Sequence, residues 1–370
     1  MRTVLLALAA LVPASACSVP TEIADVADSR AELEEAFRAT SIPSVSAIVV
    51  NAESVVWQES YGFADVDRPA DGLTFYDVAS VSKLVVATAV MQLVEQGLLD
   101  LDADVNGYLP FHVVHPAHPD VPVTIHHLLT HTSGLTWPET DADVPGLYVP
   151  YPLDAAPPLG TWLPEFILPG GAHYVPTVWR ASAPGEQEFY SNIGVSLAAY
   201  LVEVVAQTDF NAYVRERIFA PLQMSSTSFA YADLDMAHAA RPYGRGGWAA
   251  FTRVRPYPSG DLKTTPEDFS HLLMAYLGEG AYQGRRILQP STVRRILSVE
   301  NPASGLCLIW ARTLAGWYGH SGGKDGVAAY AEIQPERGVA LMIVANQRHS
   351  AVYPGGRIHA LVRRIAWDDG

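Results

Sequence analysis

Ser80 and Lys83 are two residue types that can act together in nucleophilic catalysis, and they stand three positions apart in residues 79–97. Residues three apart share one face of a helix, so the amine can reach the hydroxyl oxygen. The rest of this stretch is mostly apolar, which predicts a helix buried nearly all round. Burial lowers the pKa of an amine, so Lys83 is a candidate proton acceptor for Ser80, otherwise a weak nucleophile.

A Ser-x-x-Lys pattern is short and has low specificity by itself. A second copy occurs at residues 321–324, where Gly322 and Gly323 disfavour a helix. Lysine content gives the first copy more weight. Of the 24 lysines and arginines, only Lys83, Lys263 and Lys324 are lysines, so a lysine in an apolar helix is unusual in this chain.

Two further short motifs follow along the chain. Tyr190-Ser191-Asn192 comes after Pro184-Gly185-Glu186 and directly before an apolar run of helical character. Its side chains are expected on a loop positioned by that helix. Residues 319–323, Gly-His-Ser-Gly-Gly, are expected to precede a strand and to give backbone N–H groups room to approach a ligand.

Taken in this order, Ser80-x-x-Lys83, Tyr190-x-Asn192 and His320-Ser321-Gly322 resemble the three active-site motifs of the serine β-lactamase and penicillin-binding superfamily. The likeness is closest to its class C branch, which includes class C β-lactamases, D-alanyl-D-alanine carboxypeptidases, D-aminopeptidases and carboxylesterases. The similarity covers residues 42–346, apart from much of 136–182.

This resemblance implies a role for each matching residue. Ser80 attacks an acyl carbon, Lys83 and Tyr190 share the proton transfers, and Asn192 orients Lys83 and the substrate. His320, Ser321 and Gly322 border the substrate. The backbone N–H groups of Ser80 and Gly323 form the oxyanion hole, and water then hydrolyses the acyl-enzyme. No metal or other cofactor is expected.

One departure from the family pattern bears on the substrate. His320 stands where β-lactamases and the peptidases usually carry the lysine of Lys-Thr-Gly, which helps to attract a substrate carboxylate. Histidine is mostly neutral at pH 7, which favours a neutral ester or amide unless Lys324 or an arginine restores the charge. The alternatives are a β-lactamase or D-Ala-D-Ala carboxypeptidase, an acyltransferase, and a non-catalytic homologue that binds cell-wall fragments. His320 could instead only brace the strand.

Composition describes an ordinary globular chain of 370 residues, 49% hydrophobic and 17% charged. Its net charge of −15 argues against nucleic acid as a partner and against a basic membrane-binding patch. We expect one hydrolase domain over residues 30–370, acting as a monomer on a small ester, amide or peptide.

The N-terminus has the pattern of an export signal over residues 1–16, with Arg2, an apolar run and Ala14-Ser15-Ala16 before Cys17. Small residues directly before a cysteine resemble a bacterial lipobox, so we expect a lipid anchor on Cys17 and a periplasmic or cell-surface location. A plain secreted protein is the alternative. Residues 17–29 are polar and small and are expected to form a tether.

Two segments permit more than one interpretation. Six of the twelve histidines lie within residues 112–131, which suggests a metal cluster, but prolines interrupt them and no familiar ligand spacing occurs. Residues 136–184 form an insertion rich in proline and aromatic residues, where long helices are not expected. This insertion either lines an apolar substrate pocket or packs its own rings.

The remaining pattern predicts an α+β fold. A hairpin of strands follows an N-terminal helix, several helices follow, and strands return near the C-terminus. We therefore expect one antiparallel β-sheet built from both chain ends, flanked by helices, with an inserted mostly helical lobe. The expected helices are 30–40, 125–135, 193–207, 211–219, 266–277, 290–299 and 358–367, and the expected strands are 45–50, 54–63, 304–311, 326–334 and 338–346.

Overall fold

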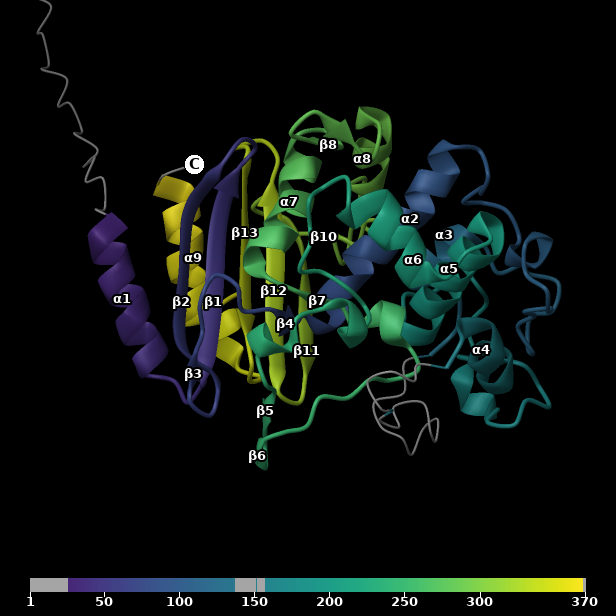
Figure 1. The fold of residues 1–370 in the computed structure, drawn as a ribbon. Coiled ribbons are helices and arrows are strands. Elements are labelled where there is room, and N and C mark those ends of the chain that lie inside the picture. Colours follow the sequence, from purple (N-terminus) through teal and green to yellow (C-terminus); the bar gives the residue numbers. More distant parts are fainter. Residues whose placement is uncertain (1–25, 137–150, 152–156, 369–370) are drawn as a thin grey trace, which may run out of the picture.

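The computed structural model describes residues 26–136, 151 and 157–368 (Figure 1). A seven-stranded antiparallel sheet has the order β10-β11-β12-β13-β1-β2-β3. Its strands are β1 Ser44–Asn51, β2 Val55–Asp65, β3 Arg68–Pro69, β10 Ala311–Arg312, β11 Tyr318–Lys324, β12 Val327–Gln334 and β13 Val339–Ala345. Three small pairs join β4 Tyr76–Asp77 to β7 Lys263–Thr264, β5 Tyr243–Gly244 to β6 Gly247–Trp248, and β8 Ala281–Tyr282 to β9 Arg285–Arg286.

The α-helices are α1 Val26–Arg38, α2 Lys83–Glu95, α3 Ile125–Leu129, α4 Leu159–Ile167, α5 Asn192–Ala206, α6 Phe210–Val214, α7 Pro266–Leu277, α8 Pro290–Ile296 and α9 Arg357–Asp368. Shorter turns include η1 Ala79–Ser82, η2 Val105–Gly107 and η7 Tyr257–Ser259. A π-helical turn, η4 Arg215–Phe219, continues α6. Among the described residues no single helix is long and apolar enough to span a membrane; α5 and the segment Phe210–Phe219 reach that limit only together, with a bend of 78° between them.

The two ends of the chain meet at the centre of the sheet. β1, near the N-terminus, pairs with β13, near the C-terminus, in a register that places Val49 opposite Leu341. Both strands are almost entirely buried, which matches their runs of Val, Ile, Leu and Ala. The expected antiparallel sheet built from both ends of the chain is confirmed.

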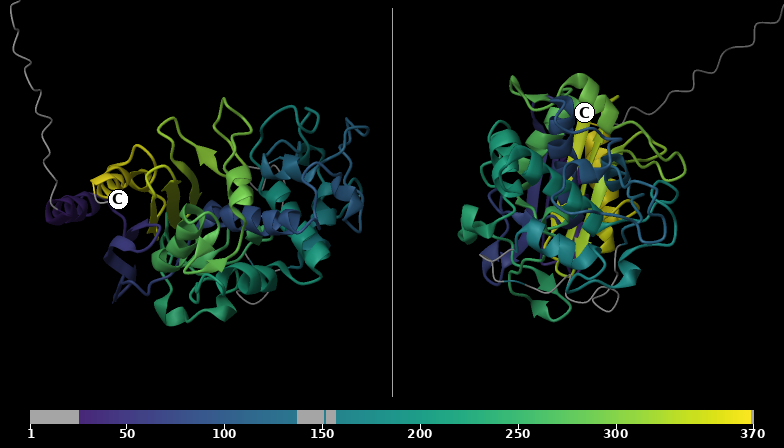
Figure 2. Two further views of the ribbon diagram at one scale, coloured as in Figure 1. Left: turned by 90° about the horizontal axis from the view of Figure 1, so that it is seen from above. Right: turned by 90° about the vertical axis from the view of Figure 1, so that its right-hand side faces the viewer.

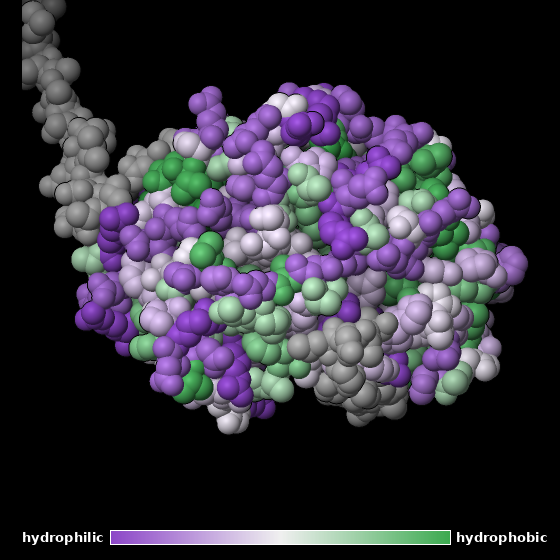
Figure 3. All heavy atoms as spheres, in the orientation of Figure 1, coloured by the Kyte–Doolittle hydropathy of each residue, from purple (hydrophilic) through white to green (hydrophobic). Residues whose placement is uncertain are grey.

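Helices cover both faces of this sheet, and most of the others form a separate lobe at one end. α1 and α9 pack together, and α9 covers β1 and β13 on one face, while α7 covers the same strands on the other (Figures 1 and 2). The lobe of α3, α4, α5 and α6 lies next to α2, on the side of the molecule away from α1 and β2. Hydrophilic residues cover most of the face seen in Figure 3, with apolar residues scattered among them.

The structure corrects several expected boundaries. Residues 304–311 were expected to form a strand, but only Ala311 enters β10. Gly305 and Ile309 have positive φ angles of 76° and 69°, which are incompatible with an extended strand. The apolar residues 306–310 are buried, but in turns rather than in a strand. The Gly-His-Ser-Gly-Gly motif precedes the expected strand, β12, and itself lies within a further strand, β11, that was not expected. The expected helix of residues 79–97 begins as a 3₁₀ turn, η1, and becomes α-helical only from Lys83, in α2.

Other expectations fall partly outside the described residues. These include the export signal, Cys17 and residues 17–25 of the tether, together with 137–150 and 152–156 of the insertion. α1 begins at Val26, so the last four residues of the expected tether are helical. In the described part of the insertion, α4 runs for nine residues despite Pro164 in its interior.

Candidate active site

The amine of Lys83 lies beside the hydroxyl of Ser80. Nζ of Lys83 donates to Ser80 Oγ over 3.0 Å and to the carbonyl oxygen of Ser259 over 2.5 Å. Lys83 is the first residue of α2 and is 0% exposed. Burial lowers the pKa of this amine well below its ordinary value of 10.5. The geometry and electrostatics therefore suit Lys83 to accept the Ser80 proton.

The turn that carries Ser80 is held from both sides. Ala79 has a φ of 44°, a left-handed conformation that is uncommon for a residue with a Cβ atom. Its N–H donates to Oδ1 of Asp77 over 2.8 Å. Leu262 bonds to the same turn before and after Ser80. Its carbonyl oxygen accepts from the N–H of Val78 over 3.0 Å, and its N–H donates to Ser82 Oγ over 3.0 Å. These bonds fix where the nucleophile points.

Tyr190 faces the amine from the helical lobe. Its ring centre is 4.8 Å from Lys83 Nζ and 4.4 Å from the ring of His131. The next residue, Ser191, caps α5 by accepting from the N–H of Gly194 over 2.9 Å. Asn192 is the first residue of α5 and is buried. The helix start thus positions both Tyr190 and Asn192.

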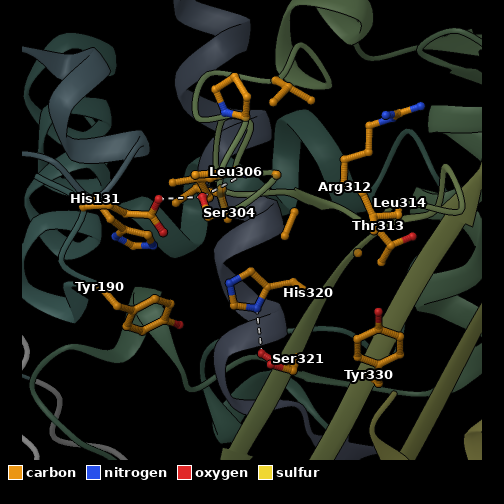
Figure 4. Close-up of a pocket in the computed structure, with 18 residues that line it drawn as sticks. His131, Tyr190, Ser304, Leu306, Arg312, Thr313, Leu314, His320, Ser321 and Tyr330 are labelled. Atoms are coloured by element: carbon orange, nitrogen blue, oxygen red, sulfur yellow. Dashed lines mark hydrogen bonds between the residues drawn. The ribbon is translucent and has the colours of Figure 1, made fainter. Parts of the chain in front are cut away.

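β11 forms the opposite wall of the site, where His320 faces Tyr190 with 6.1 Å between ring centres (Figure 4). Nδ1–H of His320 donates to the carbonyl oxygen of Ser321 over 2.6 Å. Burial, with the nearby Lys83 amine, lowers the pKa of His320 to about 3. The imidazole is therefore neutral at pH 7, as the sequence argument assumed.

A cavity of about 610 Å³ opens in front of Ser80. The residues that line it are Ser80, Tyr190, His320, Ser321, Gly322, Gly323, Tyr330, Arg348, Tyr353 and Pro354. Gly322 is held in place by the Tyr353 hydroxyl, which donates to its carbonyl oxygen over 2.9 Å. The structure therefore gathers the predicted nucleophile, the motif in β11 and both residues of the predicted oxyanion hole around one opening, with Lys83 buried behind it.

A second cavity, of about 840 Å³, adjoins this opening (Figure 4). It begins at His131, Tyr190, His320 and Ser321 and runs between β11 and residues 299–314. Leu306 and Ile309 belong to its wall, which exposes more apolar than polar surface. Beside the Ser80 cavity there is thus room for a sizeable apolar group.

Sequence reasoning missed several residues of the site. His131 is buried with a φ of 55°, and its Nδ1 accepts from the N–H of Ser191 over 3.2 Å, so it braces the Tyr190 loop. Ser259 provides the second acceptor for Lys83, and Arg348 lines the cavity. Arg348 and Ser259 carry no local signal, whereas His131 belongs to the histidine-rich residues 112–131.

The histidine-rich segment holds loops together. His115 and His118 bond through Nε2 to the carbonyl oxygens of Arg180 and Ala181 over 2.9 and 2.8 Å. His126 contacts Glu300 at 3.0 Å, and His127 completes a capping box at the start of α3. Within the described ranges, no group of three or more His, Cys, Asp or Glu side chains could hold a metal ion.

Known proteins resemble this chain over most of its length. Protein flp of Staphylococcus aureus (strain N315) is 23% identical over 332 residues, which are 85% of this chain and 61% of that protein. The chain therefore spans less than two thirds of that relative. The D-alanyl-D-alanine-carboxypeptidase/endopeptidase AmpH of Escherichia coli (strain K12) is 24% identical over 378 residues, covering 94% of this chain and 92% of that protein.

Solved structures share the fold. The D-amino acid amidase from Ochrobactrum anthropi SV3 complexed with L-phenylalanine has a TM-score of 0.71 at 23% identity, covering 92% of this chain and 98% of that one. A class C beta lactamase has a TM-score of 0.72 at 18% identity with the same coverage. The octameric penicillin-binding protein homologue from Pyrococcus abyssi has a TM-score of 0.71 at 22% identity and covers 93% and 77%.

The sequence model of the Beta-lactamase family matches residues 30–363, nearly the whole described chain. This match agrees with the motif order and with the antiparallel sheet flanked by helices. The chain therefore belongs to the Beta-lactamase family.

Proposed function

We propose that this protein hydrolyses its substrate through an acyl-enzyme on Ser80. The observation that carries the proposal is the fully buried Lys83 amine, 3.0 Å from Ser80 Oγ. Within the described part of the chain Lys83 has no ion pair with a carboxylate, so burial lowers the pKa of the amine and favours the neutral form, which can accept a proton.

The reaction has two halves. Lys83 takes the Ser80 proton as Oγ bonds to the substrate carbonyl carbon, and the N–H groups of Ser80 and Gly323 stabilise the oxyanion. The proton then moves to the leaving group by way of Lys83 and Tyr190, and the bond to that group breaks. In the second half water replaces the leaving group, gives up a proton to the same pair, and releases the acid and free Ser80.

A neutral ester or amide is our preferred substrate. His320 is uncharged at pH 7, and Lys324 is engaged by two carboxylates, so neither supplies a free cation to the cleft. The adjoining cavity with its largely apolar wall suits an apolar acyl or leaving group. Side-by-side rates on a short-chain nitrophenyl ester, a chromogenic cephalosporin and a D-Ala-D-Ala peptide test this choice, with Ser80→Ala as the control for each.

One observation favours a second candidate, a D-Ala-D-Ala carboxypeptidase or β-lactamase. Arg348 lines the Ser80 cavity, with its Nε 3.5 Å from where a Cβ atom on Gly323 would lie. A guanidinium there can pair with a substrate carboxylate. If this candidate is correct, Arg348→Gln raises KM for the peptide or cephalosporin about tenfold and leaves ester hydrolysis unchanged. Names of relatives such as AmpH and the D-amino acid amidase support amide or peptide substrates.

The covalent step has a direct test. A fluorophosphonate or a slow acyl donor should add its mass to the peptide that contains Ser80, and Ser80→Ala should remain unmodified. Folded protein that hydrolyses substrate without this adduct contradicts the proposal. Transfer to added alcohol or amine, seen by product analysis, would indicate an acyltransferase instead.

We also propose that the protein is exported and lipid-anchored through Cys17, on the strength of the N-terminal sequence pattern alone. Metabolic labelling with a radioactive fatty acid should mark the wild type and not Cys17→Ser. Release of unlabelled, cleaved wild-type protein into the medium would support plain secretion. Our expectation of a monomer remains a prediction, to be tested by light scattering, since the Pyrococcus abyssi relative is octameric.

A further inference from the structure

Lys324, directly after the motif in β11, joins three segments that form the walls of the site. Its Nζ lies 2.6 Å from Asp77 Oδ2 and 2.8 Å from Asp261 Oδ1. Asp77 holds the Ser80 turn through the N–H of Ala79. Asp261 lies two residues beyond Ser259, whose carbonyl accepts from Lys83. One ammonium group therefore links β11, the nucleophile turn and the segment that contacts the catalytic amine.

The carboxylates in this cluster are almost inaccessible to water. The side chains of Asp77 and Asp261 are 6% and 0% exposed, whereas that of Lys324 is 36% exposed. Lys263, paired with Asp77 in the β4–β7 ladder, is also fully buried. Asp77 and Asp261 thus balance Lys324 and Lys263, and buried charges of this kind are tolerated only when they are paired.

This balance bears on Lys83. Gly260 joins Ser259, the acceptor for Lys83, to Asp261, and its carbonyl oxygen lies 3.4 Å from Lys324 Nζ. An unbalanced Asp261 would therefore act on Lys83 across this short segment, through an interior of low dielectric constant where a negative charge favours the protonated amine. We propose that Lys324 is a positioning residue that neutralises Asp77 and Asp261, holding the Ser80 turn in register with β11 and limiting the negative charge that acts on Lys83. This inference rests on the proposed function for its catalytic meaning, but its electrostatic content is measurable in the unreacted protein.

Other groups face these amines and are part of the same electrostatic environment. Tyr231 and Arg253 lie near the carboxylate cluster, and the ring centre of Tyr231 is 4.1 Å from Lys263 Nζ. The groups that face Lys83 itself are Tyr190, His131 and His320. Burial makes protonation of both histidines unfavourable, so neither ring places a charge beside Lys83.

The lysine content of the chain permits a direct experiment. Because the sequence has only three lysines, protein labelled with ¹³C at lysine Cε gives three resonances, which single substitutions assign. Their pH titrations report the pKa of Lys83 without any substrate. We expect the pKa of Lys83 to rise by about one unit in Lys324→Met. The acidic limb of kcat/KM should move to higher pH by the same amount, with circular dichroism confirming that the variant is folded.

Three further variants make the test specific. Lys324→Arg keeps the charge and should leave the titration of Lys83 unchanged. The double variant Asp261→Asn/Lys324→Met removes one charge of each sign and should bring the pKa of Lys83 back toward the wild-type value, even if Lys324→Met alone fails to fold. Arg294→Met removes an exposed ion pair with Glu279, remote from the site, and should change nothing.

The outcomes separate this inference from the proposed function. The role of Lys324 is overturned if the pKa of Lys83 is the same in the wild type and in Lys324→Met. It is also overturned if the pKa of Lys83 shifts as far in the double variant as in Lys324→Met. If Lys83 shifts as expected but Ser80 forms no adduct in the wild type, the proposed function fails while the electrostatic role stands.

Discussion

Gly322 of β11 lies so close to Val78 that a Cβ atom at position 322 would be 2.1 Å from the Val78 carbonyl oxygen. The same added atom would be 3.1 Å from the backbone nitrogen of Ser80. These contacts are all with backbone atoms, so no flexible side chain could move aside to make room for a Cβ atom. The motif glycine therefore sets the spacing between the strand and the nucleophile turn.

Gly322→Ala is expected to push β11 away from the Ser80 turn and to lower kcat/KM about 100-fold, because displacements near 1 Å misalign reacting groups. Ester hydrolysis and fluorophosphonate labelling measure the effect. Gly107→Ala is the matched control, since an added Cβ there meets no atom within 4 Å. Equal activity of the two variants would show that the contact at Gly322 does not matter.

Lys83→Met is expected to lower kcat/KM about 10²–10⁴-fold, because it removes the proton acceptor. It should also raise Tm at pH 7. In the wild type, folding requires Lys83 to lose a proton that the unfolded chain binds. This free-energy cost is present below the ordinary lysine pKa of 10.5 and vanishes as pH rises through that value, and Lys83→Met removes it. The gain in Tm should therefore shrink toward pH 10. Thermal unfolding at several pH values checks this, and a lower Tm at pH 7 would contradict it.

In the wild type, kcat/KM should rise with pH as Lys83 becomes neutral, with its midpoint well below 10.5. His320→Gln should leave that midpoint unchanged, because burial lowers the pKa of His320 to about 3 and the ring carries no charge in the working range. pH-rate profiles on the nitrophenyl ester between pH 5 and 9 compare the two proteins. A midpoint that moves in the variant would mean that His320 titrates during catalysis.

His131→Ala is expected to lower kcat about tenfold by loosening the Tyr190 loop, since it removes a ring contact of about 0.5–1.5 kcal/mol and the acceptor for Ser191 N–H. Its KM should change less than its kcat, because Tyr190 acts in proton transfer. The exposed His112→Ala serves as the control from the same histidine-rich segment. A purely structural role would instead lower Tm and leave kcat unchanged at temperatures where the variant is folded.

The contact between Ser80 and Lys83 was predictable from the sequence because it depends on short-range spacing. Ser80 and Lys83 stand three positions apart, and one helical turn, η1 leading into α2, brings them together. The alternating and continuous apolar runs likewise fix the strands β1, β12 and β13 and the helices between them, because each must bury its apolar side. His320 could be assigned as a neutral residue from its type, and its buried surroundings strengthen that assignment.

Only the tertiary structure decided which distant groups share the site. Residues 304–311 look like a strand, but positive φ angles at Gly305 and Ile309 turn them into a wall of the larger cavity. Asp77, Asp261 and Lys324 are separated by more than sixty positions from one another, and no local pattern relates them. They meet because β4 pairs with β7 and β11 packs against η1, and buried charges have to find partners wherever the fold brings them together.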